Sequence, residues 1–167
     1  LGKNISAIEV KGTFDDCQRM VKSAFLDEDL NNKLNLTSAN SINIARLIPQ
    51  SFYYFWAMAQ LHDHEKVIFS VPSGNYGNLT AGLLAKAMGL PIHGFIASSN
   101  INDIVPKYLQ KNFFDAKPSK ATISNAMDVG DPSNYGRMTE LYGHSWEGIT
   151  KDISGYSFTD SDTKSSM

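Results

Sequence analysis

The stretch KVIFSVPSGNYGNLTAGLLAKAMGLPIHGFIASS, residues 66–99, decides the fold. It opens with a continuous apolar run at 66–72, which is typical of a strand covered on both faces, as in a parallel sheet. Residues 79–90 are predicted to form a helix with Gly89 at its C-cap, and residues 91–99 a second strand. These elements make a βαβ unit with a right-handed crossover. The fold class is therefore α/β, with an open, mostly parallel sheet and flanking helices.

Composition and charge restrict the class of protein. The chain has 167 residues, of which 42% are hydrophobic and 11% aromatic, as in a globular protein. Its 15 basic and 17 acidic residues are well mixed, so we expect no nucleic-acid and no membrane partner. The single cysteine, Cys17, excludes an internal disulfide and fits a reducing compartment. With no membrane-spanning run and no signal-peptide pattern in view, we expect a cytoplasmic protein.

Outside the βαβ unit the sequence predicts mostly helices. A short strand is expected at 5–12, and Thr13 with Asp16 resembles a capping box that starts a helix. Residues 41–61 are helical and apolar on most sides, so this helix should be buried, and Pro49 inside it predicts a kink. Three short helices are expected near the C-terminal end, at 103–110, 133–143 and 145–155.

The turn between the first strand and its helix reads SGNYGN, residues 73–78. In an open parallel sheet, ligands lie at the carboxyl ends of strands against helix N-termini. Glycines let backbone N–H groups converge there, and such a nest binds phosphate without a basic side chain. The spacing fits neither a Walker A loop nor GxGxxG. The alternative is an ordinary strand–helix turn with Asn78 or Thr80 as N-cap.

A second helix start has the same chemistry. In NSINIAR, residues 40–46, Asn40 or Ser41 can cap a helix and leave donors at its positive end. Arg46 is close enough in sequence to reach over the first turns with a bidentate guanidinium. The alternative is a capping residue and a solvated arginine.

One short segment suggests a metal site. His62, Asp63, His64 and Glu65 are consecutive, but no third cluster of ligands is visible elsewhere in the sequence. We therefore interpret the segment as polar surface and expect no bound metal.

Four motifs together closely resemble the threonine synthases, which depend on pyridoxal 5′-phosphate (PLP) and have the tryptophan-synthase-β-like fold, fold type II. The motifs are SANSINIARLIPQ (38–50), VPSGNYGNLTAGLLAKAMGLP (71–91), FIASSNINDIVPKYL (95–109) and TISNAMDVGDPSN (122–134). The resemblance covers nearly all of the chain. The chain also opens without methionine and stops at TDSDTKSSM, so we expect residues 1–167 to be a single incomplete α/β segment from the centre of a larger two-domain PLP enzyme.

The resemblance implies an activity and two binding sites. The family's reaction converts O-phospho-L-homoserine and water to L-threonine and phosphate, as a carbon–oxygen lyase acting on phosphate. The residues that match the cofactor's phosphate loop are Gly74, Asn75, Tyr76, Gly77 and Asn78. The residues that match the site for the substrate's own phosphate are Asn40, Ser41 and Arg46. Residues 125–127 match a wall of the active site.

The resemblance also implies what this chain lacks. The family's Schiff-base lysine belongs to a Phe-Lys-Asp type motif upstream of the matching segment. Lys66 starts a strand and Lys86 is expected on the exposed half of a helix, so neither stands in that context. We therefore expect no catalytic residue here, and no activity of the chain alone. Two alternatives stay open: a phospho-lyase of the same kind that releases a keto acid, or a non-catalytic phosphate-binding remnant.

Overall fold

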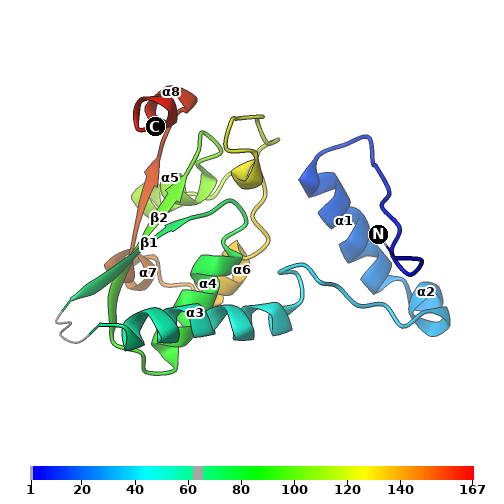
Figure 1. The fold of residues 1–167 in the computed structure, drawn as a ribbon, viewed down its shortest axis with the longest axis horizontal. Coiled ribbons are helices and arrows are strands. Elements are labelled where there is room, and N and C mark those ends of the chain that lie inside the picture. Colours follow the sequence, from blue (N-terminus) through cyan, green and yellow to red (C-terminus); the bar gives the residue numbers. More distant parts are fainter. Residues whose placement is uncertain (1, 62–65) are drawn as a thin grey trace. The chain divides into compact units, whose positions relative to one another are not determined.

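The computed structural model describes residues 2–61 and 66–167, which form two compact units (Figure 1). Unit 1 is Leu1–Leu36 and unit 2 is Thr37–Met167. The segment His62, Asp63, His64 and Glu65, considered above as a metal site, lies outside the described residues.

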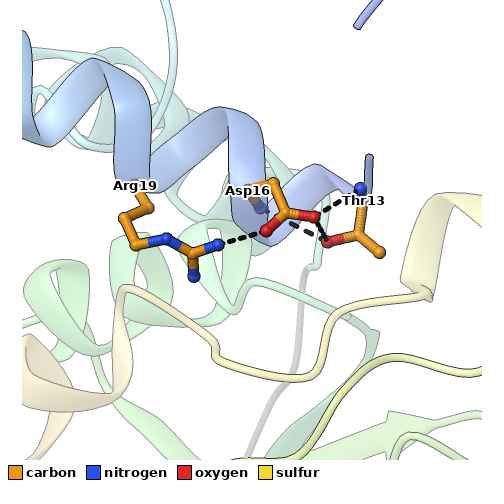
Figure 2. A network of polar contacts seen from close by, with 3 residues as sticks. All are labelled: Thr13, Asp16 and Arg19. Atoms are coloured by element: carbon orange, nitrogen blue, oxygen red, sulfur yellow. Dashed lines mark hydrogen bonds and ion pairs between the residues drawn. The ribbon is translucent and has the colours of Figure 1, made fainter. Parts of the chain in front are cut away.

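Unit 1 consists of two helices, α1 (Phe14–Leu26) and α2 (Glu28–Lys33). The predicted capping box is confirmed at the start of α1 (Figure 2): the Thr13 N–H donates to Asp16 Oδ2 at 2.8 Å, and the Asp16 N–H donates to Thr13 Oγ1 at 3.3 Å. Arg19 donates to the other oxygen of the same carboxylate. These hydrogen bonds, the one from the Thr13 backbone first, lower the pKa of Asp16. The helix thus begins where two otherwise unpaired donors are satisfied.

The strand expected at residues 5–12 is wrong. Those residues make no strand pairing, and all of them are exposed. A strand is defined by its partner, and no described segment pairs with this one.

Unit 2 carries the sheet. In chain order its elements are η1 (Ile44–Arg46), α3 (Leu47–Ala59), β1 (Val67–Pro72), α4 (Gly77–Ala87), β2 (Ile92–Ser99), α5 (Ile104–Lys111), η2 (Asn125–Met127), α6 (Tyr135–Leu141), α7 (Trp146–Asp152), β3 (Ile153–Ser157) and α8 (Asp160–Ser165). The three strands lie in the order β1-β2-β3, and both pairs are parallel. This confirms the α/β class and the βαβ unit at 66–99.

One face of the sheet holds the core. Phe69 pairs with Phe95, and Phe95 with Ile153, so the three side chains share a face. Tyr54 of α3 packs edge-on against the first two rings, with centroids 4.9 Å and 6.0 Å away. A Cβ placed on Gly155 would lie 2.7 Å from Pro106 Cα, so α5 covers the same face at β3. Helix α3, which precedes β2 in the sequence, and helix α5, which follows it, therefore pack on the same face of the sheet.

The other face of the sheet is open, which contradicts the expectation of a strand covered on both faces. Ile68 of β1 is 53% exposed and Tyr156 of β3 is 52% exposed. Ser70 and Ser154 lie on the same face and are exposed as well. The apolar run of β1 indicated burial, but no described helix covers these side chains.

Helix α3 also differs from its prediction. It starts at Leu47 rather than near residue 41, and the Asn43 side chain caps the preceding turn, η1, by accepting from the Ala45 N–H at 3.1 Å. Pro49 is therefore the third residue of α3, where a backbone N–H would have no intrahelical partner. The predicted kink is wrong, and α3 runs without a break (Figure 1).

The burial predicted for α3 is correct on one side only. Leu47, Tyr54 and Met58 are buried, whereas Phe52 and Trp56 are mostly exposed. Near the C-terminal end, the helix expected at 145–155 stops at Asp152, and the following residues form β3. That strand was missed because ISG is too short for a period to show.

Candidate functional site

Residues 73–76 join β1 to α4 at the carboxyl end of the sheet, and the candidate loop 74–78 runs into the first turn of α4. Its middle residue, Tyr76, is the N-cap of α4 and has left-handed backbone angles, φ 59° and ψ 20°. The N-caps considered from the sequence, Asn78 and Thr80, instead lie inside the helix. The Tyr76 ring is 2% exposed, and this burial raises the pKa of its hydroxyl, opposed by the Ser99 hydroxyl. A buried ring thus fixes a backbone turn that is unusual for a residue other than glycine.

The asparagine side chains of the loop hold the loop itself. Asn78 accepts from the Ser73 hydroxyl at 2.5 Å and donates to the Pro72 carbonyl at 2.9 Å. Asn75 accepts from the N–H and the hydroxyl of Ser133, at 2.6 Å and 2.9 Å. Both carboxamides are therefore engaged within the protein.

The donors left for a ligand belong to the backbone. Among the described residues, no acceptor is recorded for the N–H groups of residues 74–78, which lead into the first turn of α4. The positive end of the helix dipole lies at the same place. Converging, unpaired N–H groups at a helix N-terminus are the chemistry of a phosphate site.

Two glycines let other segments approach this loop closely. A Cβ on Gly74 would lie 2.7 Å from Met127 Cα, so the backbone of η2 packs directly on the loop. A Cβ on Gly77 would lie 3.0 Å from Ser41 Cβ. The structure therefore brings the two candidate phosphate segments, 74–78 and 40–41, into contact, and places Met127 beside the first of them.

The second segment is a turn over residues 38–43. Asn40 Oδ1 accepts from the Ile42 N–H at 3.2 Å and from the Ser41 hydroxyl at 3.3 Å. Ser41 Oγ in turn accepts from Asn75 Nδ2 at 2.9 Å and from Asn134 Nδ2 at 3.1 Å. Neither Asn40 nor Ser41 caps a helix, contrary to the sequence-based alternative, because η1 begins later. The Ser41 side chain instead lies against Gly77 at the start of α4.

Arg46 lies at the end of η1 and is exposed. Its Nη1 donates to the Ala39 carbonyl, one residue before Asn40. The guanidinium therefore reaches the turn that contains Asn40 and Ser41, as its sequence position predicted. Its other N–H groups have no acceptor among the described residues.

Three residues of this cluster had no assigned role in the sequence. Ser133 and Asn134 lie before α6, and Arg137 lies in its first turn. Asn134 is fully buried and its Nδ2 also donates to the Asn75 carbonyl at 3.0 Å. Arg137 donates to the carbonyls of Ser41 and Ile42. Partial burial lowers the pKa of its guanidinium. The motif DPSN contains Ser133 and Asn134 but not Arg137, and the sequence gives no reason to place any of the three near residue 41.

A second polar cluster holds residues 125–127, the segment that the resemblance assigns to a wall of the active site. Asp128 follows η2, and its carboxylate accepts from Asn100 Nδ2 at 2.7 Å, from the Thr122 hydroxyl at 2.8 Å and from Asn102 Nδ2 at 3.2 Å. These contacts fix residues 120–128 against the end of β2. A hollow of about 400 Å³ opens there, lined in part by Pro72, Ser98 and Met127.

Lys86 is not on a freely exposed surface, contrary to the sequence-based expectation. Its ammonium lies 2.9 Å from Asp152 Oδ1 and 3.3 Å from the His93 carbonyl, and the side chain is 26% exposed.

The helices give no sign of a membrane span: none in the part of the chain that the structure describes is long and apolar enough to cross a membrane.

Known proteins with similar sequences are threonine synthases. Threonine synthase of Haemophilus influenzae is 48% identical over 169 residues, covering all of this chain, and that of Escherichia coli is 49% identical over 166 residues. The chain is homologous to the threonine synthases. It spans about 40% of the length of these relatives. No protein-family model matches it.

Solved threonine synthases share the fold. The crystal structure from Escherichia coli superimposes with a TM-score of 0.91 at 46% identity, covering all of this chain and 39% of that one. A PLP-bound threonine synthase from Brucella melitensis gives 0.74 at 31% identity, with 92% and 38% covered. The three-stranded parallel sheet and its helices thus match part of a fold-type-II PLP enzyme.

Proposed function

We propose that the full-length protein is a threonine synthase, which converts O-phospho-L-homoserine and water to L-threonine and phosphate with PLP. The homology to threonine synthases supports the activity, and the PLP-bound Brucella melitensis relative supports the cofactor. Within that enzyme, this chain supplies two phosphate sites. Well-mixed charge and a single cysteine support a cytoplasmic location.

The observation that carries this proposal is the contact between the two turns. Ser41 Cβ lies 3.0 Å from where a Cβ of Gly77 would be, and Asn75 Nδ2 donates to Ser41 Oγ. A reaction in which cofactor and substrate each carry a phosphate needs two adjacent anion sites. Two donor-rich turns at one end of α4 meet that need.

The residues of the loop fit the cofactor's phosphate. Gly74 and Gly77 have no room for a side chain, and the N–H groups of residues 74–78 have no recorded acceptor among the described residues. We therefore assign Gly74, Asn75, Tyr76, Gly77 and Asn78 to that phosphate, with backbone N–H groups as the donors. When bound, PLP supplies an electron sink for the carbanion of the amino acid substrate.

The substrate's phosphate is assigned to Asn40, Ser41 and Arg46. Two amide donors occupy the lone pairs of Ser41 Oγ, so its proton is directed away from them, toward the side-chain oxygen Oδ1 of Asn40 at 3.3 Å. A phosphate oxygen is a stronger acceptor than that amide. Ser41 and the free donors of Arg46 would then stabilise the negative charge that grows on the phosphate as it leaves.

In this proposal the described part of the chain holds and orients groups, and the general base is supplied from elsewhere. Lys86 is paired with Asp152. We infer that the lysine of the reaction belongs to the rest of the protein and expect the 167-residue chain alone to be inactive.

The test is to supply the intact protein, from the complete reading frame, with PLP and O-phosphohomoserine, and to measure released phosphate and amino acid product together. Threonine in step with phosphate supports the proposal. Phosphate with a keto acid would replace it with the phospho-lyase, which shares both phosphate sites. No phosphate from a protein that retains PLP would overturn it.

A further inference from the structure

Arg137 reaches the substrate-phosphate turn from a distant part of the chain. It lies in α6, 96 residues after Ser41 in sequence, and its Nη1 donates both to the Ser41 carbonyl and to Asn134 Oδ1, the latter at 2.8 Å. Its Nη2 donates to the Ile42 carbonyl. One guanidinium therefore donates hydrogen bonds to two consecutive carbonyls of the turn and to a buried asparagine.

The two carbonyls depend on this arginine. Among the described residues, no backbone N–H donates to the carbonyl of Ser41 or of Ile42, although the carbonyl of Asn40 pairs with the Asn43 N–H at 3.0 Å. The turn follows no strand and precedes a short 3₁₀ helix, so secondary structure does not hold it. Arg137 is the group that fixes the direction of these carbonyls, and with it the Ser41 side chain.

Asn134 completes the arrangement. While its Oδ1 accepts from Arg137, its Nδ2 donates to Ser41 Oγ at 3.1 Å and to the Asn75 carbonyl at 3.0 Å. The arginine thus orients the amide that in turn occupies a lone pair of the Ser41 hydroxyl. A chain of three polar groups runs from α6 to the proposed phosphate donor.

We propose that Arg137 is a positioning residue for the substrate's phosphate: it holds residues 40–42 so that the Ser41 hydroxyl points to the leaving group. This inference rests on the proposed function. It assigns no contact between Arg137 and the substrate. The planar fork of a guanidinium is essential to it, since a lysine ammonium at this position has the charge but not the paired donors.

The experiment compares wild type, Arg137→Ala and Arg137→Lys in the intact protein, with Arg19→Ala as an exposed arginine control. Three quantities are measured: the Kd of inorganic phosphate by calorimetry with PLP bound, KM and kcat for O-phosphohomoserine, and the Kd of PLP by absorbance. We expect Arg137→Ala to raise both the Kd of phosphate and the KM for O-phosphohomoserine by roughly tenfold to a hundredfold, as for a lost hydrogen bond of a charged group. The Kd of PLP should change by less than about threefold, within the scatter of neutral substitutions.

Arg137→Lys decides between positioning and charge. If it loses most of the phosphate affinity, the geometry of the fork matters and the proposal holds. Phosphate affinity at the wild-type level in Arg137→Lys, or in Arg137→Ala, would overturn it. An equal loss of affinity for PLP and for phosphate in the variants would also overturn it, because a general structural role would give that result.

The outcomes also separate the two proposals. A wild-type protein that binds phosphate but releases none from O-phosphohomoserine contradicts the proposed function alone, and the variants still test Arg137 through phosphate binding. A wild-type protein that turns over while Arg137→Ala matches it contradicts the positioning role alone. Absence of both phosphate binding and turnover in the wild type overturns both.

Discussion

The two turns at the N-terminus of α4 offer their donors in different ways. The 74–78 loop is held largely by neighbours in sequence, since Asn78 bonds to Ser73 and Pro72 and the buried Tyr76 ring fixes the turn, with Ser133 as a distant donor to Asn75. Its free donors are backbone N–H groups. The 38–43 turn has local bonds of Asn40 but also needs distant side chains, those of Asn75, Asn134 and Arg137, and it offers a hydroxyl and a guanidinium.

This difference sets which substitutions affect each site. A backbone site is sensitive to added atoms, because a Cβ displaces the chain that carries the donors. A side-chain site is sensitive to removed atoms. The experiments below use glycine-to-alanine changes against the first turn and truncations against the second.

Gly74→Ala should have the largest effect. The new Cβ would lie 2.7 Å from Met127 Cα and 2.9 Å from the carbonyl carbon and oxygen of that residue, and a backbone cannot rotate away. We expect unfolding free energy to fall by about 1–3 kcal/mol and PLP to be lost. Thermal denaturation and PLP absorbance measure this.

Gly136→Ala is the matched control for Gly74→Ala. That glycine lies in α6 with nothing within 4 Å of its added Cβ. It should retain PLP and gain up to about 1 kcal/mol of stability from helix propensity. If both variants lose PLP alike, steric approach at Gly74 does not explain the first result.

Gly77→Ala sharpens the comparison because it lies between the two sites. Its Cβ would meet Ser41 Cβ at 3.0 Å and Ser41 Oγ at 3.4 Å, so the turn, not η2, must move. We expect KM for O-phosphohomoserine to rise by about tenfold, from 1–2 kcal/mol of displaced packing, with a smaller loss of PLP affinity. A PLP loss greater than that of Gly74→Ala would contradict the assignment of the two turns.

Ser41→Ala removes atoms instead of adding them. The amides of Asn75 and Asn134 would each lose an acceptor, at a cost of about 1–3 kcal/mol, and the proposed donor to the leaving phosphate would be gone. Steady-state kinetics should show a lower kcat and a higher KM with PLP absorbance unchanged. Unchanged kcat would remove Ser41 from the chemistry.

Arg46→Ala should give the smallest change. The guanidinium is exposed, and exposed ion pairs contribute at most about 1 kcal/mol, so we expect a severalfold higher KM for O-phosphohomoserine. The absorbance of bound PLP should stay the same. Loss of the cofactor in this variant would show that the division into two sites is wrong.

The features that sequence predicts are those set by near neighbours. The capping box at Thr13, the βαβ unit and the turn between β1 and α4 each depend on residues within one turn or one crossover. The prediction of burial was wrong where burial depends on distant partners. Ile68 and Trp56 are apolar but exposed, because no described element covers them. Arg137 was missed for the same reason, since nothing in a helix pattern tells which carbonyl, 95 residues away, the side chain will meet.

The uncovered face of the sheet has a thermodynamic consequence. Ile68 and Tyr156 already contact water in the folded chain, so unfolding adds little to their hydration. Since newly hydrated apolar surface is the source of the heat-capacity increment, the isolated chain should unfold with less than the usual ~12–15 cal/mol/K per residue. Its stability curve should then be flatter than that of a domain with both sheet faces covered, and its melting transition broader.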